Sequence, residues 1–359
     1  MSRYEEEKGY PPYHPAMMVK VLLYAYCIGV PSSRKIEKRL CEDIAFRALA
    51  GLFLQALKLC WQAGLVKLGH VALDGTKIKA NASKHKAMSY KRMKEEDGHY
   101  GKDKRGDELP KELAFRESRL KKGQEAKQAL EAEAKAETKV VASTNKKHSG
   151  VPDDKAQRNF TDPESRIMPA PGGKHFIQAD NAQAVVDSVH QVIVAAEVTN
   201  QPSDRGQAEP MMEIVKVNTG QLPRQLSVDA GYFSSGAVQN LTTAGIDIYM
   251  PPDKIDHRES LPPAPRGRIP KNLSIVDRMW RKLRTKKGRQ RDGLRKVLPE
   301  PVFGQIKQAR GFNQFLLRGE DKADSEWKVI CASHNLLKLF RARIAGLVGQ
   351  EFWEQLSAA

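Results

Sequence analysis

The sequence predicts an α/β protein with a mixed sheet, a helical N-terminal domain and a long helical insertion after the first strand. Two segments predict the strands of the sheet: residues 71–74 and residues 226–229 are mainly apolar, and each ends at a single aspartate. A third observation predicts the insertion, because residues 84–160 are rich in Lys, Glu, Ala and Arg, most of which favour helix.

The charge balance predicts a polyanionic partner. The chain has 359 residues, enough for two or three domains or one domain with large insertions, and its net charge is +17. Such an excess favours nucleic acid first and an acidic membrane surface second. Residues 266–296 alone hold 13 Lys and Arg against two Asp. A block of this kind is often a disordered tail, but this one is internal, and we interpret it as a surface for the phosphate backbone.

Several classes of protein are disfavoured. No apolar run approaches the length of a membrane span, and the first residues have no signal-peptide core, so we expect a cytoplasmic, nucleoid-associated protein without a membrane partner. The four cysteines contain no Cys-x-x-Cys pair, which disfavours a zinc ribbon or a disulfide framework; they are Cys27, Cys41, Cys60 and Cys331.

Residues 1–68 are expected to form a helical domain of the DNA-binding type, shortened relative to related proteins. A first helix should begin at Pro15, where proline is well tolerated, and a second should carry Arg34 and Lys35. The short turn between them is typical of a helix-turn-helix, although a helical hairpin that only packs its own core fits equally well. Residues 51–65 have apolar side chains at helical spacing, which predicts a core helix.

The rest of the chain is expected to form one domain over residues 69–340, followed by a C-terminal helix over 341–359. Within the insertion, residues 110–141 should be one long helix and residues 143–174 a loop. Residues 176–186 and 191–198 should form an antiparallel pair of strands. The further expected elements are a helix over 206–217 capped by Asp204, a helix over 236–244, a strand over 246–250, strands over 315–317 and 328–330, and a helix from His334. The order β-β-β-α-β-α-β-α, with an acid on the first strand, is that of a ribonuclease-H-like sheet.

Three separated carboxylates predict the chemistry. Asp74 and Asp229 end apolar strands, and Glu300 opens a helical stretch next to the basic block. Two Mg²⁺ or Mn²⁺ ions ~4 Å apart would activate a nucleophile on a phosphodiester and stabilise the developing charge. Such hard cations prefer carboxylate oxygens and keep several waters, so three acids suffice. Each acid also has an ordinary explanation, as a turn aspartate or as a first-turn acid at a helix N-terminus.

Basic side chains around these acids are the predicted DNA contacts. Lys307 follows Glu300 by two helical turns on the same face, where it could meet a phosphate. His70, His190 and His334 have no second histidine at metal-ligand spacing, so we expect them to be structural. The predicted DNA-binding residues are Arg34, Lys35, Lys77, Lys79, Lys286, Lys287, Arg289, Arg291, Arg295, Lys296 and Lys307.

A set of motifs spread over nearly the whole chain resembles bacterial insertion-sequence transposases of the DDE type. The segments that carry the resemblance are 13–15, 31–37, 73–77, 181–183, 229–232 and 300–304. The resemblance implies a ribonuclease-H-like catalytic domain behind a helical N-terminal domain. It also implies cut-and-paste movement through terminal inverted repeats, with Asp74, Asp229 and Glu300 as the metal-binding triad. Double-stranded DNA, both element ends and target, is then the partner, and a homodimer on DNA is expected by analogy.

The chain departs from related transposases in two places. They carry a Tyr-x2-Arg-x3-Glu-x6-Lys pattern, in which Lys307 matches here, whereas Lys296 and Gly293 stand at the arginine and tyrosine positions. They also have a further turn and helix where this chain passes directly from Ala50 to Gly51. An internally deleted, non-catalytic copy that only binds DNA is therefore one alternative. A nuclease or resolvase of the same fold, which hydrolyses DNA without joining it, is another.

Overall fold

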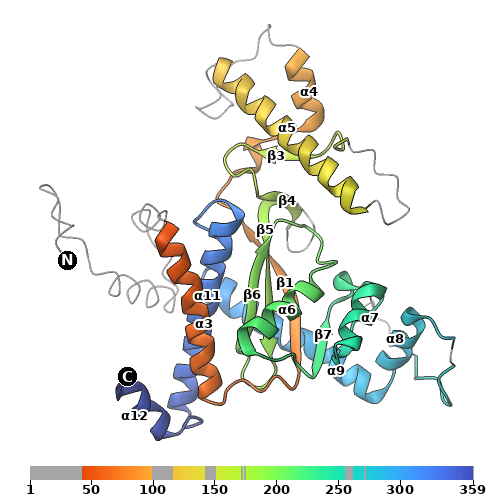
Figure 1. The fold of residues 1–359 in the computed structure, drawn as a ribbon, viewed down its shortest axis with the longest axis vertical. Coiled ribbons are helices and arrows are strands. Elements are labelled where there is room, and N and C mark those ends of the chain that lie inside the picture. Colours follow the sequence, from red (N-terminus) through yellow and green to blue (C-terminus); the bar gives the residue numbers. More distant parts are fainter. Residues whose placement is uncertain are drawn as a thin grey trace, which may run out of the picture.

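A six-stranded mixed sheet lies at the centre of the protein (Figure 1). The structure is a computed structural model, and it describes residues 43–98, 116–141, 151–170, 173, 175–254, 262–270 and 272–358. The strands run in the order β4-β5-β1-β7-β8, and β6 pairs with β5. Their bounds are β1 Val71–Lys79, β4 Arg166–Pro169, β5 Phe176–Asp187, β6 Ile193–Thr199, β7 Gln225–Val228 and β8 Asp247–Tyr249.

The first strand is central in this sheet. Over its whole length β1 pairs antiparallel with β5, from Val71 opposite Asp187 to Lys79 opposite Ala179. Its other edge pairs in parallel with β7, but only at residues 71–73. The antiparallel pair predicted over 176–198 is confirmed as β5 and β6. Because β7 ends after three paired residues, no strand of the described part of the chain pairs with that edge of β1 from residue 74 onward, apart from an isolated bridge at Lys79.

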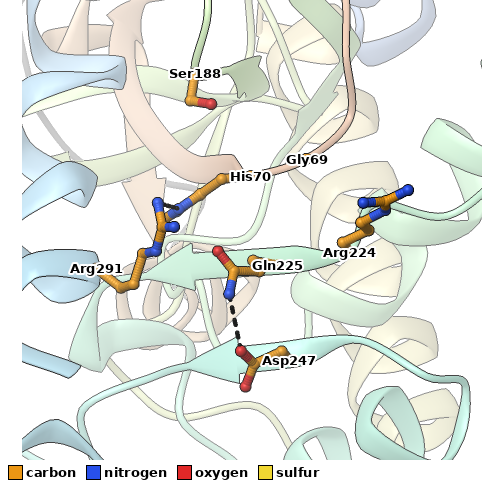
Figure 2. Close-up of a pocket in the computed structure, with 7 residues that line it drawn as sticks. All are labelled: Gly69, His70, Ser188, Arg224, Gln225, Asp247 and Arg291. Carbon is orange, nitrogen blue, oxygen red and sulfur yellow. Dashed lines mark hydrogen bonds between the residues drawn. The ribbon is translucent and has the colours of Figure 1, made fainter. Parts of the chain in front are cut away.

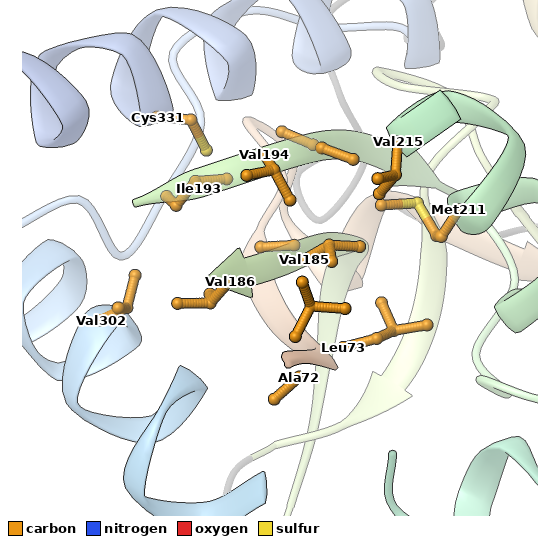
Figure 3. Packing of buried hydrophobic residues seen from close by; sticks show 14 of the residues in the cluster. Ala72, Leu73, Val185, Val186, Ile193, Val194, Met211, Val215, Val302 and Cys331 are labelled. Atoms are coloured by element: carbon orange, nitrogen blue, oxygen red, sulfur yellow. The ribbon is translucent and has the colours of Figure 1, made fainter. Parts of the chain in front are cut away.

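Helices cover the sheet and close the core. Figure 3 shows side chains of the strands between Met211 and Val215 of α6, Val302 of α10 and Cys331 of α11. The bounds of the helices around the sheet are α3 Asp43–Gln62, α6 Ala208–Thr219, α7 Ser235–Thr243, α8 Ile275–Leu283, α9 Lys286–Val297, α10 Pro299–Gly304, the π-helix η5 Gln305–Ala309, α11 Glu320–Ile344 and α12 Gln350–Ala358. None of the described helices combines the length and apolarity that crossing a bilayer requires.

The helix α3 belongs to the same core as the sheet. It lies along α11, which in turn packs on β5 and β6 (Figure 1). Phe53, Leu57 and Cys60 of α3 are buried in the main apolar cluster, and the Cys60 thiol donates to the Asn335 carbonyl at 3.4 Å. The core helix predicted over 51–65 is therefore present, beginning earlier, at Asp43.

The insertion has a small core of its own and projects from one end of the molecule (Figure 1). Its elements are the 3-10 helix η1 Lys84–Lys86, β2 Ala87–Ser89, α4 Tyr90–Gly98, α5 Arg116–Val141 and β3 Gln157–Asn159. Met88, Tyr90, Met93, Ala126 and Leu130 form that core. The long helix predicted over 110–141 is found as α5, and residues 110–115 lie outside the described residues.

Two strand predictions near the C-terminus are wrong. Residues 328–330 lie inside α11, which begins at Glu320 and not at His334. Its acidic first turn follows Gly319, and Trp327 and Ile330 lie on its buried face. Residues 315–317 form no strand, and only an isolated bridge joins Gln314 to Lys79 of β1. Helix α11 runs past residue 341 to Ile344, and α12 follows as a separate helix.

Two further predictions are corrected. Residues 143–174 contain the strands β3 and β4 and are not only a loop. The helix predicted over 206–217 is α6, whose N-cap residue is Gln207, so Asp204 does not cap it. The helices predicted from Pro15 and around Arg34 lie outside the described residues, as do Cys27 and Cys41.

Candidate active site

Asp74 lies where the sheet opens. It is the first residue of β1 beyond the pairing with β7. The three residues before it are fully buried, so the strand is fixed up to this point. The Asp74 Oδ1 accepts the Gly75 amide at 2.8 Å. Its carboxylate thus stands at the end of a rigid element, which suits a residue that must hold a fixed position.

Asp229 follows the last residue of the neighbouring strand β7. It precedes the short 3-10 helix η4 Ala230–Tyr232, but its side chain does not cap that helix. The Asp229 Oδ1 is instead 2.7 Å from Nη1 of Arg295 on α9. The Arg295 Nε also donates to Asp292 at 2.9 Å, so one guanidinium joins two carboxylates.

Glu300 is an exposed residue in the first turn of α10. Buried Pro299, Val302 and Phe303 hold this short helix against the core. The chain then continues as the π-helix η5, a form that often occurs at functional sites. The predicted continuous helix from Glu300 to Lys307 is therefore interrupted after Gly304.

The electrostatics show that these three acids share one neighbourhood. The pKa of Asp74 is raised to about 7, first by burial and then by the negative charges of Asp229, Asp204 and Glu300, against the opposing hydrogen bond from Gly75. A carboxylate whose pKa is raised by nearby acids lies in a negative environment that favours a bound cation. Within the described part of the chain, however, no three Asp, Glu, His or Cys side chains stand close enough together to enclose a metal ion.

The sequence analysis missed the fourth acid at this site. Asp204 lies in the loop before α6, and its Oδ1 accepts hydrogen bonds from the amides of Asn181 at 2.7 Å and Gln183 at 2.9 Å. The Lys77 ammonium is 3.5 Å from the same oxygen. The hydroxyl of buried Tyr232 donates to the other end of the Gln183 side chain. In the sheet Gly75 pairs with Gln183 and Lys77 with Asn181, so this polar cluster lies on the face of β1 opposite to the Asp74 side chain.

Two protein-family models match the chain. A transposase domain of the DUF772 family matches residues 1–59, and a transposase DDE domain matches residues 268–340. The second match includes Arg295, Glu300 and Lys307. Both matched segments are thus similar to transposase domains, which supports a DDE-type insertion-sequence transposase. No curated protein and no solved structure matches the chain.

The predicted DNA-binding lysine after Glu300 faces inward. The Lys307 ammonium donates to the Thr76 hydroxyl at 3.0 Å and to the Lys77 carbonyl at 2.9 Å. Burial lowers its pKa. Lys307 therefore joins the π-helix to β1 beside Asp74, and a phosphate contact would have to be made from that position.

The other predicted DNA contacts divide into two groups. Lys79, Lys286 and Arg289 are exposed. The remaining described members contact protein groups, since Lys287 lies 3.4 Å from Asp247 and Arg291 contacts His70. Most of this basic surface belongs to α8 and α9, which pack beside β7 and β8. Arg34 and Lys35 lie outside the described residues.

The contact of Arg291 with His70 fixes α9 to the sheet (Figure 2). The Arg291 guanidinium donates to His70 Nδ1 at 3.3 Å, so the His70 proton is on Nε2, which lies 2.9 Å from the Ser227 hydroxyl. The Ser227 hydroxyl in turn donates to the Arg291 carbonyl at 2.9 Å. Burial and the charge of Arg291 lower the His70 pKa to about 4, so the ring is neutral. His70 thus has a structural role at the floor of a pocket between β1, β7 and α9.

Proposed function

We propose that this transposase cleaves DNA at the ends of its element and joins the freed ends to target DNA in a metal-dependent reaction. The observation that carries the proposal is the effect of Asp229 and Glu300 on the pKa of Asp74, because these three acids are separated by more than 70 residues along the chain at each interval. Together with the DDE-domain match, this supports the three acids as the catalytic triad.

The strand order supports a ribonuclease-H-like arrangement. A central strand that carries the first acid lies antiparallel to β5 and parallel to β7, and the second acid follows β7. The ends of parallel strands meet at one edge of a sheet, which is where ligand sites of such sheets form. Helix α10 brings the third acid to the same edge, because it packs on β1 and β5.

The donor set suits Mg²⁺ or Mn²⁺, because all three predicted ligands are carboxylates. Asp74 and Asp229 would hold two ions between them, and Glu300 would complete the second. Bound there, the ions would activate a water or a 3′-hydroxyl and stabilise charge on the phosphate. Because the acids are not yet close enough to enclose an ion, binding would draw them together.

The remaining residues bind and orient the DNA. The exposed Lys286 and Arg289 of α9 present positive charge next to the site, where they would contact the phosphate backbone of element and target DNA. Lys307 would keep Glu300 in register with Asp74 through its two hydrogen bonds to β1. Since two element ends must be held together, we propose a homodimer on DNA.

The test is strand cleavage and joining by the purified full chain on DNA that carries the inverted repeats found beside its gene. We expect Asp74→Asn, Asp229→Asn and Glu300→Gln each to abolish cleavage and joining with Mg²⁺ while DNA binding is retained. Glu351→Gln, which changes an exposed acid on α12, is the matched control and should remain active. Cleavage without a joined product would identify a nuclease, and an Asp229→Asn protein with unchanged activity would leave only a DNA-binding role.

A further inference from the structure

Arg295 occupies the carboxylate that the proposed metal site needs. Its Nη1 lies 2.7 Å from Asp229 Oδ1, and its Nε donates to Asp292 at 2.9 Å. The Arg295 side chain is only 15% exposed, whereas that of Asp229 is 47% exposed. The guanidinium is therefore largely buried, whereas about half of the Asp229 side chain is open to solvent.

This ion pair and a bound cation compete for Asp229. A guanidinium is permanently charged, and a divalent ion on Asp229 would meet that charge at close range. Consistent with this, the described acids are not gathered at metal-binding spacing while the pair is formed. Metal binding at Asp229 would therefore be stronger with Arg295 moved away.

The backbone of α9 is not free to make that movement. Gly288 lies so close to the end of α8 that a Cβ there would be 2.0 Å from the Lys282 carbonyl. Arg291, one turn before Arg295, is fixed by its hydrogen bonds with His70 and Ser227. The movable part is thus the Arg295 side chain, which can rotate while the helix stays in place.

A DNA phosphate is the group that would draw Arg295 away. The guanidinium has five donors in a planar fork, which matches a phosphate as well as it matches a carboxylate. Exposed Lys286 and Arg289 lie on the same helix and would bring DNA to α9. Arg295 can then leave Asp229 and bind the phosphate, so that Asp229 becomes available to the cation.

We propose that Arg295 competes with a cation for Asp229 in the free protein and transfers to a DNA phosphate when DNA binds, so that DNA and metal bind cooperatively. The inference rests on the proposed metal site. Linkage makes the coupling reciprocal, so metal also strengthens DNA binding. The exchange favours metal binding in the DNA complex over metal binding in the free protein.

The first experiment measures Mn²⁺ binding to the full chain without DNA by isothermal titration calorimetry. We expect Arg295→Gln to bind Mn²⁺ about tenfold more tightly than wild type, within the range usual for coupled sites. Arg341→Gln removes the same charge from an exposed position of α11 and should leave the affinity unchanged. Arg295→Lys, which keeps the charge without the fork, should lie between the two and guards against a folding defect in the glutamine variant.

The second experiment measures binding of a short labelled duplex of arbitrary sequence by fluorescence anisotropy. Mn²⁺ should tighten the wild-type complex and have less effect on Arg295→Gln. Unchanged Mn²⁺ affinity in Arg295→Gln and Arg295→Lys, with binding still lost in Asp229→Asn, would overturn the Arg295 proposal and leave the metal site standing. Full Mn²⁺ binding by Asp229→Asn would overturn the metal site and the coupling with it.

Discussion

Lys307 joins the turn after Glu300 to the strand of Asp74, because its ammonium donates to the Thr76 hydroxyl at 3.0 Å. A second bond to the Lys77 carbonyl at 2.9 Å fixes the same contact. Two of the three proposed catalytic acids are thereby held in register by a residue that touches neither of them. The π-helix η5 makes this possible, because it places Lys307 over β1.

Replacing Lys307 by Met should separate the two elements. The loss of two charge-assisted hydrogen bonds from a partly buried site is expected to cost about 1–2 kcal/mol of unfolding free energy. Cleavage should fall more than DNA binding, because Glu300 loses its position while the exposed basic residues stay. Urea unfolding and a duplex-binding assay measure the two effects. Lys58→Met on the exposed side of α3 is the control, and equal behaviour of both variants would contradict the role of Lys307.

Gly75 is required by the polar cluster around Asp204. A Cβ at this position would lie 2.4 Å from the Gln183 amide nitrogen, 2.8 Å from an Asp204 oxygen and 2.9 Å from the Asn181 oxygen. Gly75→Ala should therefore destabilise the fold by roughly 1–3 kcal/mol, the usual cost of overpacking a well-packed site. Gly123→Ala on α5, where a Cβ meets nothing within 4 Å, should be neutral or stabilising. Thermal denaturation compares the two, and equal melting temperatures would argue against a rigid cluster.

The basic surface of α9 should account for salt-dependent DNA binding. The double variant Lys286→Gln, Arg289→Gln removes two exposed charges, so the slope of log K against log salt concentration should become less steep by about 2. The matched control is Lys58→Gln, Lys67→Gln, which removes two exposed charges outside α9. Anisotropy titrations at several salt concentrations decide the matter, and an unchanged slope would place the DNA elsewhere.

The sheet could be predicted because its strands carry strong local patterns. The apolar run up to Asp74 and the alternating residues after it gave β1, and the two Val-rich stretches gave β5 and β6. The three acids were predicted for the same reason, since each ends or opens a recognisable element. Only the fold brings the three acids near one another, and the raised pKa of Asp74, to which Asp229 and Glu300 contribute, indicates this.

Other features have no local signal. The stretch around Trp327 and Ile330 resembles a strand because α11 is buried on several sides, so its apolar residues are nearly continuous. Asp204 resembles a helix cap, and only the arrangement of β5 beside β1 brings Asn181 and Gln183 to its carboxylate. The pairing of Arg295 with Asp229 likewise joins residues 66 positions apart.

His70 should make stability depend on pH. Its folded pKa of about 4 is below the ordinary value of 6.5, so the unfolded chain binds the proton first as pH falls. The stability from neutral His70 is complete above pH 6.5 and is lost as pH falls toward 4, by up to ~3 kcal/mol at about 1.4 kcal/mol per pKa unit. His70→Gln should remove this part of the pH dependence. Urea unfolding of both proteins at pH 7.5, 5.5 and 4.5 tests it, and parallel curves would contradict it.

Asp204 should be needed as a hydrogen-bond acceptor more than as a charge. Asp204→Leu would leave the buried amides of Asn181 and Gln183 without their acceptor, which should cost about 2 kcal/mol or more. Asp204→Asn keeps an oxygen for both amides and loses only the partly exposed ion pair with Lys77, so its cost should stay below ~1 kcal/mol. Urea midpoints rank the two variants against wild type. If the asparagine variant is as unstable as the leucine variant, the ion pair with Lys77 is what holds this loop against β1.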